Sequence, residues 1–295
     1  MKYVLIGDNA FIGISHLSHD RARQRLKELR LETISRVFET ALSCGATGFS
    51  FTVHPTNLRI LETLQNAGTI SRLDLCATLP YAAGYVRTVN EKGIVGLIND
   101  LMSRYSLADK AKLSLRAGLS TLTMDPTGMI RTYIDAELLP IDRLGGRLAT
   151  ILLHDIVTDL AVSFQSRNLI DCYIQHVHDK YHVNPGFVTR NLVRFVKFFR
   201  DTNLPLTDTV IMTPVNKIGF QMNPTREACE TCLSELHDVT VIAMSILAGG
   251  YLTLEEAIGY IRQLNLSGVV VGVSSEEHAQ QVFTKLRQIA EPVKT

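Results

Sequence analysis

Ionisable side chains stand directly after apolar segments at several places in this sequence. His54, His154 and Asp155 are the residues that we expect to act in catalysis. An imidazole beside a carboxylate suits general acid–base chemistry, because histidine gains and loses a proton near neutral pH. Asp8 and Arg116 follow other apolar segments, and a guanidinium such as that of Arg116 can bind a carboxylate or phosphate with two parallel hydrogen bonds. The sequence therefore predicts proton transfer on a small anionic metabolite.

A second group of residues has the types that bind anions. Glycine allows backbone N–H groups to approach an anion closely, and a helix N-terminus attracts negative charge. The simpler alternative for these residues is a turn followed by ordinary helix capping. The residues expected to bind substrate or phosphate are Asp8, Asn9, Arg116, Asn216, Ser245, Gly249, Gly250, Ser274 and Ser275.

Short apolar segments that alternate with amphipathic stretches must position these side chains. Most are apolar throughout, as parallel strands with two buried faces are. The eight expected strands are residues 3–7, 47–52, 74–79, 112–117, 149–154, 209–213, 239–244 and 269–273. Eight strand–helix repeats predict one (β/α)8 TIM-barrel domain over residues 1–295, with an insertion around residues 156–186. The alternative is an open doubly wound sheet, but no G-x-G-x-x-G follows any expected strand.

One strand assignment stays open, because residues 183–188 form a ninth candidate and either they or residues 112–117 lie outside the barrel. Helix starts are indicated at Pro55 and at Asn223–Pro224. Capping boxes are indicated at Thr253 with Glu256 and at Ser274 with Glu277. Residues that follow barrel strands share one rim, so Asp8, His54, Arg116 and His154 are expected at a common mouth.

Four segments resemble the aldo/keto reductase superfamily: CGATGFSFTVHPTNLRILETL, ATILLHDIVTD, VTVIAMSILAGGYLTLEEA and GVVVGVSSEEHAQQVF. The resemblance covers about half of the chain, is strongest in the C-terminal third, and implies a TIM barrel with NAD(P) as a possible cofactor. The family reduces carbonyls with an Asp, a Tyr, a Lys and a His. Here Ser50, His54 and Leu79 stand near the first three positions, and only His154 matches. The resemblance thus implies the fold but not standard carbonyl reduction, and no Lys or Arg after the last strand is placed to hold a 2′-phosphate.

Composition excludes several classes of protein. Lys and Arg number 30 and Asp and Glu 29, so the formal net charge of +1 argues against binding nucleic acid. No apolar run approaches the ~18–20 residues of a membrane span, and the N-terminus lacks the apolar core of a signal peptide. We therefore expect a cytoplasmic protein whose partner is a small molecule.

The expected enzyme is either a nicotinamide-linked oxidoreductase or a lyase or isomerase without a redox cofactor. Two other functions remain as alternatives. Asp8, His54, His154 and Asp155 are also suitable ligands for a divalent metal, which would make the barrel a metal-dependent hydrolase or lyase. The second alternative is a non-catalytic barrel that binds a ligand or a partner protein.

Two clusters are interpreted as structural. The C-x-x-C of Cys229 and Cys232 lies in an expected helix, without the two further ligands of a structural zinc site. The histidines His176, His178 and His182 are interpreted as residues of a solvated helix.

Overall fold

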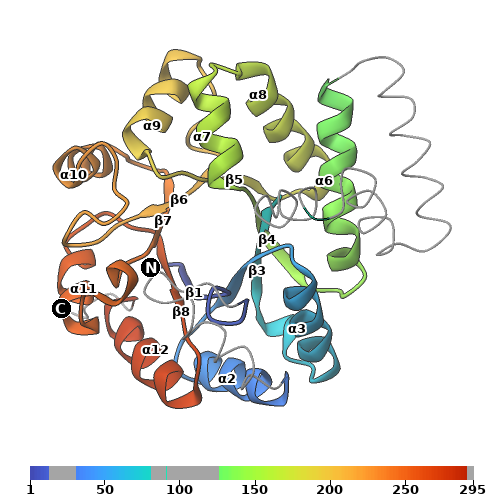
Figure 1. Ribbon diagram of the computed structural model, residues 1–295, viewed down its shortest axis with the longest axis vertical. Helices are drawn as coiled ribbons and strands as arrows, with labels where there is room; N and C mark the ends of the chain where they lie inside the picture. The colour runs from blue at the N-terminus through green and yellow to red at the C-terminus, as the bar shows by residue number, and fades with distance from the viewer. Residues whose placement is uncertain (13–30, 81–90, 92–125, 291–295) are drawn as a thin grey trace.

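Eight parallel strands close into a barrel in their order along the chain (Figure 1). The computed structural model describes residues 1–12, 31–80, 91 and 126–290. The strands are β1 (Tyr3–Gly7), β2 (Gly48–Thr52), β3 (Asp74–Leu79), β4 (Arg147–Leu153), β5 (Asn184–Val188), β6 (Val210–Pro214), β7 (Thr240–Met244) and β8 (Gly268–Gly272). The pairing of β1 with β8 closes the ring and excludes the open sheet. The predicted TIM-barrel fold is confirmed.

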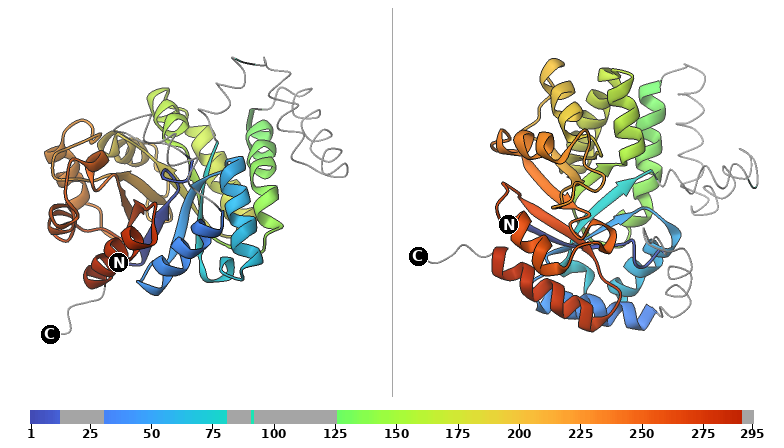
Figure 2. Two further views of the ribbon diagram at one scale, coloured as in Figure 1. Left: turned by 60° about the horizontal axis from the view of Figure 1, so that its bottom comes forward. Right: turned by 60° about the vertical axis from the view of Figure 1, so that its left-hand side comes forward.

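Helices surround the strands, as the two side views show (Figure 2). They are α2 (Leu31–Ser43), α3 (Pro55–Asn66), η1 (Ile70–Arg72), α6 (Pro126–Asp142), α7 (Asp155–Ser163), α8 (Arg167–His176), η2 (Val177–Tyr181), α9 (Leu192–Asp201), α10 (Arg226–Ser234), η3 (Ala248–Gly250), α11 (Leu254–Ile261) and α12 (Glu276–Ala290). In the described part of the chain, no helix combines the length and apolarity needed to cross a membrane.

The open strand assignment is resolved in favour of residues 183–188, which contain β5. Residues 112–117, with Arg116, lie outside the described residues. The connection from β4 to β5 contains α7, α8 and η2, so the insertion expected around residues 156–186 consists mainly of helices before β5 begins at Asn184. The expected end of this insertion at residue 186 is therefore wrong, because it lies inside the barrel strand β5.

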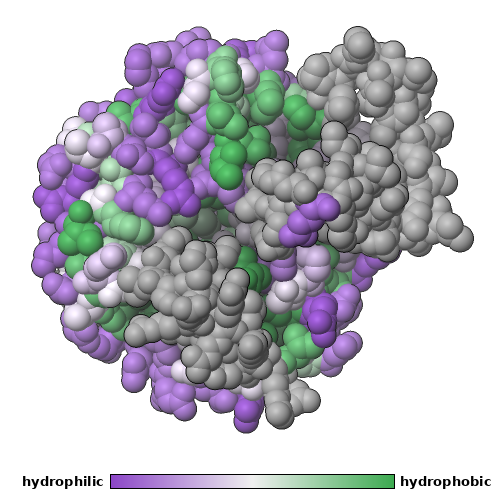
Figure 3. Space-filling model, viewed as in Figure 1, coloured by the Kyte–Doolittle hydropathy of each residue, from purple (hydrophilic) through white to green (hydrophobic). Residues whose placement is uncertain are grey.

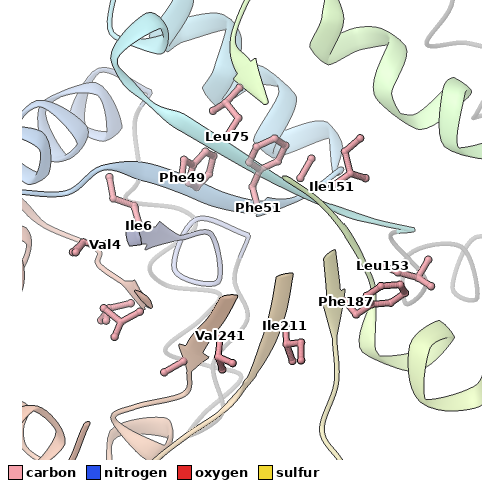
Figure 4. Packing of buried hydrophobic residues seen from close by; sticks show 14 of the residues in the cluster. Val4, Ile6, Phe49, Phe51, Leu75, Ile151, Leu153, Phe187, Ile211 and Val241 are labelled. Atoms are coloured by element: carbon pink, nitrogen blue, oxygen red, sulfur yellow. The ribbon is translucent and has the colours of Figure 1, made fainter. Parts of the chain in front are cut away.

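Successive side chains along each strand point to opposite faces of the sheet, so the core has two layers. Residues such as Phe49, Phe51, Ile151, Phe187 and Ile211 point outward against the helices (Figure 4). The alternate residues fill the barrel interior, because successive strand side chains point to opposite faces. The interior cluster comprises Tyr3, Leu5, Cys76, Leu152, Val188, Val210, Met212 and Ile242. Burial raises the pKa of the Cys76 thiol, as expected for an inert core residue.

Helix caps fix where the connecting segments begin. The capping box of Thr253 and Glu256 is confirmed at the start of α11. The box predicted at Ser274 is wrong, because Ser275 Oγ accepts the His278 N–H at 3.1 Å and α12 begins one residue later. The start of α10 is likewise displaced from Asn223 to Thr225, whose hydroxyl accepts the Ala228 N–H.

The histidine cluster is only partly solvated. His176 at the end of α8 lies 2.8 Å from a carboxylate oxygen of Asp135, and its side chain is 12% exposed. That contact ties α8 to α6, so the prediction of three solvated histidines is wrong for His176. Cys229 and Cys232 are buried on α10, in agreement with a structural interpretation.

Candidate functional site

His154 and Asp155 lie where β4 passes into α7, at the C-terminal rim of the barrel. His154 follows Leu153 in extended backbone and is the N-cap of α7. It comes two residues after the interior residue Leu152, so strand alternation directs it toward the mouth. Two hydrogen bonds fix this junction, from His154 N–H to Leu79 O and from Thr158 Oγ1 to Leu153 O.

The imidazole of His154 is oriented by the neighbouring carboxylate. His154 Nδ1 lies 2.6 Å from Asp155 Oδ1. The Ile156 N–H is 2.9 Å from the same oxygen and 3.3 Å from Nδ1, so it donates to the carboxylate. We therefore assign the proton of the neutral ring to Nδ1, which leaves Nε2 as the atom that can exchange a proton with a ligand.

Arg190 completes this arrangement from the next strand. It comes two residues after Val188 on β5, and its Nε–H donates to Asp155 Oδ2. Burial alone would raise the pKa of Asp155, but hydrogen bonds and charge from His154 and Arg190 outweigh it and hold that pKa well below its usual range. We call His154, Asp155 and Arg190 the His154 cluster. It joins a proton-transfer group to a fixed anion and a guanidinium.

Asp8 belongs to a second cluster, where β1 ends beside β2. Its Oδ2 accepts hydrogen bonds from the Thr52 N–H at 2.8 Å and from Asn57 Nδ2 at 2.7 Å. Burial raises the pKa of Asp8, partly opposed by these two bonds. Asn57 is fully buried, and its Oδ1 has no hydrogen-bond partner among the residues that the structure describes. We call Asp8, Thr52 and Asn57 the Asp8 cluster.

His54 and Asn9 lie at the same end of the barrel. His54 is the N-cap of α3, and its Nδ1 accepts the Thr56 N–H at 3.1 Å. Asn9 directly follows Asp8 and is exposed. The catalytic role of His54 and the binding role of Asn9 stay predictions. Asp8, His54 and His154 do share the strand-end rim, as expected from the barrel.

The loop after β7 uses its own backbone groups. Ser245, Ala248, Gly249 and Gly250 all have positive φ, between 49° and 101°. The N–H groups of Ala248 and Gly250 donate to Ser245 O and Leu247 O, each at 2.8 Å. The loop thus uses two backbone N–H groups that a phosphate would need as donors. This makes phosphate binding at Gly249 and Gly250 less favourable than the sequence suggested.

The end of β8 is acidic. Ser275 Oγ caps α12, and the first turn of that helix carries Glu276 and Glu277. These carboxylates already interact favourably with the helix N-terminus, and they would repel a phosphate. Glu276 is also paired with Arg36 of α2 at 3.3 Å. Residues 273–278 themselves contain no Lys or Arg that could hold the 2′-phosphate of NADP.

Asn216 has a local structural role. It is fully buried after β6, and its amide donates to Phe220 O at 2.9 Å and accepts the Phe220 N–H at 2.7 Å. Both ends of the amide are thus used to hold the loop before α10, so the amide that we expected to bind substrate is committed to the fold.

The exposed face of α7 is apolar. Ile156, Leu160 and Phe164 recur every four residues, with exposed fractions of 49%, 51% and 76%. Figure 3 shows apolar residues gathered along this helix. An apolar strip therefore begins next to the His154 cluster.

A metal site is not supported by the described residues. In that part of the chain, no three His, Cys, Asp or Glu side chains converge as metal ligands would. His54 and His154 each use Nδ1 locally, the former as a helix cap and the latter toward Asp155.

Comparison with solved structures identifies the fold. Two structures of a proposed aldo-keto reductase from Pseudomonas aeruginosa match 98% of this chain, with TM-scores of 0.56 and 0.57. Their sequence identities are 11% and 12%, and the matches cover 91% and 90% of those chains. The barrel is similar to that of aldo-keto reductases. At such identity the likeness concerns the fold alone. No family model and no curated protein matches the sequence.

Sequence reasoning missed Arg190 and Asn57. Arg190 follows β5, whose place in the barrel the sequence leaves open, so its position at a strand end could not be predicted. Asn57 lies inside α3, three residues after His54. A polar residue on the apolar face of an expected helix is the sequence feature that could have identified Asn57.

Proposed function

We propose that this chain is a barrel enzyme that acts on a small anionic metabolite by proton transfer, with His154 as the acid or base. The observation that carries the proposal is the His154 cluster at the strand-end rim, where active sites of TIM barrels lie. Asp155 holds the imidazole in one tautomer, in the role that a buried carboxylate has beside a catalytic histidine. A histidine placed in this way contributes about 10²–10⁴-fold to a rate.

Each residue of the cluster has a separate part. His154 Nε2 takes a proton from the substrate or gives one to it. Asp155 keeps the ring oriented and balances the charge of the imidazolium. Arg190 holds the carboxylate and offers its remaining N–H groups to an anionic substrate. Isomerisation and epimerisation consist of such proton transfers, and an elimination needs in addition a substrate that carries its own leaving group, to which His154 can give the proton. The donor set after β8 gives no support to an NADP-linked step.

Solvent exchange tests the proposal even while the product is unidentified. Sugar phosphates and hydroxy acids are incubated with the protein in D2O, and loss of C–H signals is followed by ¹H NMR. We expect exchange of at least one compound by the native protein, and its loss in His154→Asn. Asparagine is a favourable residue at the N-cap position of α7 but cannot transfer a proton at neutral pH.

Two results would overturn the proposal: no exchange or turnover of any compound in the panel, or exchange that His154→Asn retains. Titration with NADH or NADPH, followed by fluorescence, distinguishes a redox enzyme from an enzyme that only transfers protons. Tight binding would favour a nicotinamide-linked reductase in place of a cofactor-independent enzyme.

A further inference from the structure

A pocket of about 450 Å³ lies outside the barrel mouth, between α7, the start of α9 and the segment before α10. Its volume is in the range of small-ligand sites. The lining comprises Asp159, Val162, Ser163, Arg190, Asn191, Arg194, Asn223 and Pro224. Arg190 belongs to the His154 cluster as well, so the pocket and the proposed proton-transfer site share a guanidinium.

Two guanidinium groups line this pocket and have N–H groups that are not hydrogen-bonded within the described residues. Within the described residues, Arg190 makes its only side-chain hydrogen bond through Nε, which leaves the N–H groups of Nη1 and Nη2. Arg194 is exposed, and no carboxylate in the described part of the chain pairs with its side chain. Paired guanidinium forks of this kind match the oxygens of a carboxylate or phosphate.

The backbone that carries Arg190 is held from both sides. Its N–H donates to Asp159 Oδ2 at 3.1 Å, and its carbonyl accepts from Asn223 Nδ2 at 3.1 Å. Thr189 Oγ1 also donates to Asp159 Oδ1 at 2.6 Å. The pocket is thus preorganised, which lowers the entropic cost of binding.

Asp159 is the one carboxylate among the described residues of the lining, and it opposes the binding of an anion only weakly. Both of its oxygens already accept hydrogen bonds, from Thr189 and from the backbone of Arg190. Burial raises its pKa, opposed by these bonds, and nearby Asp155 raises it further. The negative charge of Asp159 is therefore spread over fixed donors.

We propose that this pocket binds the oxyanion group of the substrate, a carboxylate or a phosphate, between Arg190 and Arg194. The identification of the ligand as the substrate rests on the proposed function, whereas the anion site itself does not. An anion held there would present the rest of a small molecule near Asp155 and His154, since Arg190 contacts both regions. The pocket thereby limits the substrates to compounds with a terminal acidic group.

Binding of inorganic phosphate and of acetate tests the proposal, in two separate titrations at constant ionic strength followed by calorimetry or NMR. We expect saturable binding of at least one anion by the native protein, and about tenfold or greater weakening in Arg194→Ala. Arg194→Lys should recover only part of the affinity, because it restores charge without the fork. Preference for phosphate or acetate decides between the two anion chemistries.

Lys197→Ala is the matched control. Lys197 lies one turn further along α9, outside the lining, and pairs with Asp201. Its removal changes the net charge of the protein equally and should leave the affinity for either anion unchanged. The proposal is overturned if the native protein binds neither anion, or if Arg194→Ala and Lys197→Ala have equal effects.

His154→Asn separates this inference from the proposed function. It should bind the anion as the native protein does, because His154 is not in the lining. Anion binding that depends on Arg194, without any exchange activity, would refute the enzyme and retain the site. Exchange activity with anion binding insensitive to Arg194 would refute the site and retain the enzyme.

Discussion

Two parts of the strand-end rim have similar residue types and differ in what those residues do. We call them the β4–β5 rim, with His154, Asp155 and Arg190, and the β7–β8 rim, with residues 245–250 and 274–277. On the β4–β5 rim, side chains from two strands meet and retain donor and acceptor atoms for a ligand. On the β7–β8 rim, the backbone N–H groups of Ala248 and Gly250 are used within the loop, and the helix start is acidic.

The difference shows that a strand-end position is not sufficient evidence of a binding site. Polar groups also end strands to satisfy the backbone, and a cap or a tight turn uses them completely. A functional group is better recognised by the hydrogen-bonding capacity that remains after local bonds are counted. By that measure the β4–β5 rim is the better candidate site.

The largest expected effect that separates the two rims is on activity. His154→Asn should lower kcat/KM by about 100-fold or more for a substrate found by solvent exchange, because the proton-transfer atom is lost. Ser274→Ala on the β7–β8 rim should change the same quantity less than about threefold, which is below about 1 kcal/mol. Equal losses in the two variants would remove the distinction between the rims.

Asp155→Asn should reduce stability in a pH-dependent way. The pKa of Asp155 is lowered in the folded protein, so its contribution is complete above the unfolded value of about 3.9 and is lost as pH falls through the folded value. We expect the variant to lose about 2 kcal/mol in free energy of unfolding at pH 7, a figure discounted for the part-exposed Arg190. Urea unfolding at pH 7 and pH 3 measures it.

The difference between native protein and Asp155→Asn should be smaller at pH 3 than at pH 7. A difference independent of pH would mean that the carboxylate charge is not stabilised by His154 and Arg190. Asp179→Asn is the control. Asp179 forms an exposed ion pair with His178, so its substitution should change stability little at either pH.

Gly249→Ala tests whether the loop of the β7–β8 rim is shaped by backbone conformation. Gly249 has a φ of 73°, where a Cβ costs about 1 kcal/mol. We expect a loss of that size in the free energy of unfolding. Gly259→Ala is the contrasting variant, since an added Cβ in α11 meets no atom of the described residues within 4 Å and should stabilise the helix slightly. A Gly249→Ala protein as stable as the native one would contradict the expected strain.

Ser275→Ala has the smallest expected effect. Loss of the cap on α12 should cost about 0.5–1 kcal/mol, while phosphate affinity stays unchanged. Thermal unfolding and phosphate titration measure the two quantities. Weaker phosphate binding in this variant would place an anion site on the β7–β8 rim after all.

Features that depend on residues close together in the chain could be predicted without a structure. Apolar strands, the cap at Thr253 and the adjacent pair His154–Asp155 were all readable, because strand burial, helix capping and neighbouring charges are local properties. Periodicity was enough to predict the barrel. The one-residue error at Ser274 has a local origin as well, since successive serines offer two equivalent caps.

Contacts between groups far apart in the chain follow from the folded barrel and could not be predicted. Arg190 is 35 residues from Asp155 and Asn57 is 49 residues from Asp8, and each contact exists because strand pairing brings the ends of neighbouring strands together. The place of β5 in the ring was decided in the same way. Strand register and ring closure depend on the packing of the whole chain, so no short stretch of sequence carries them.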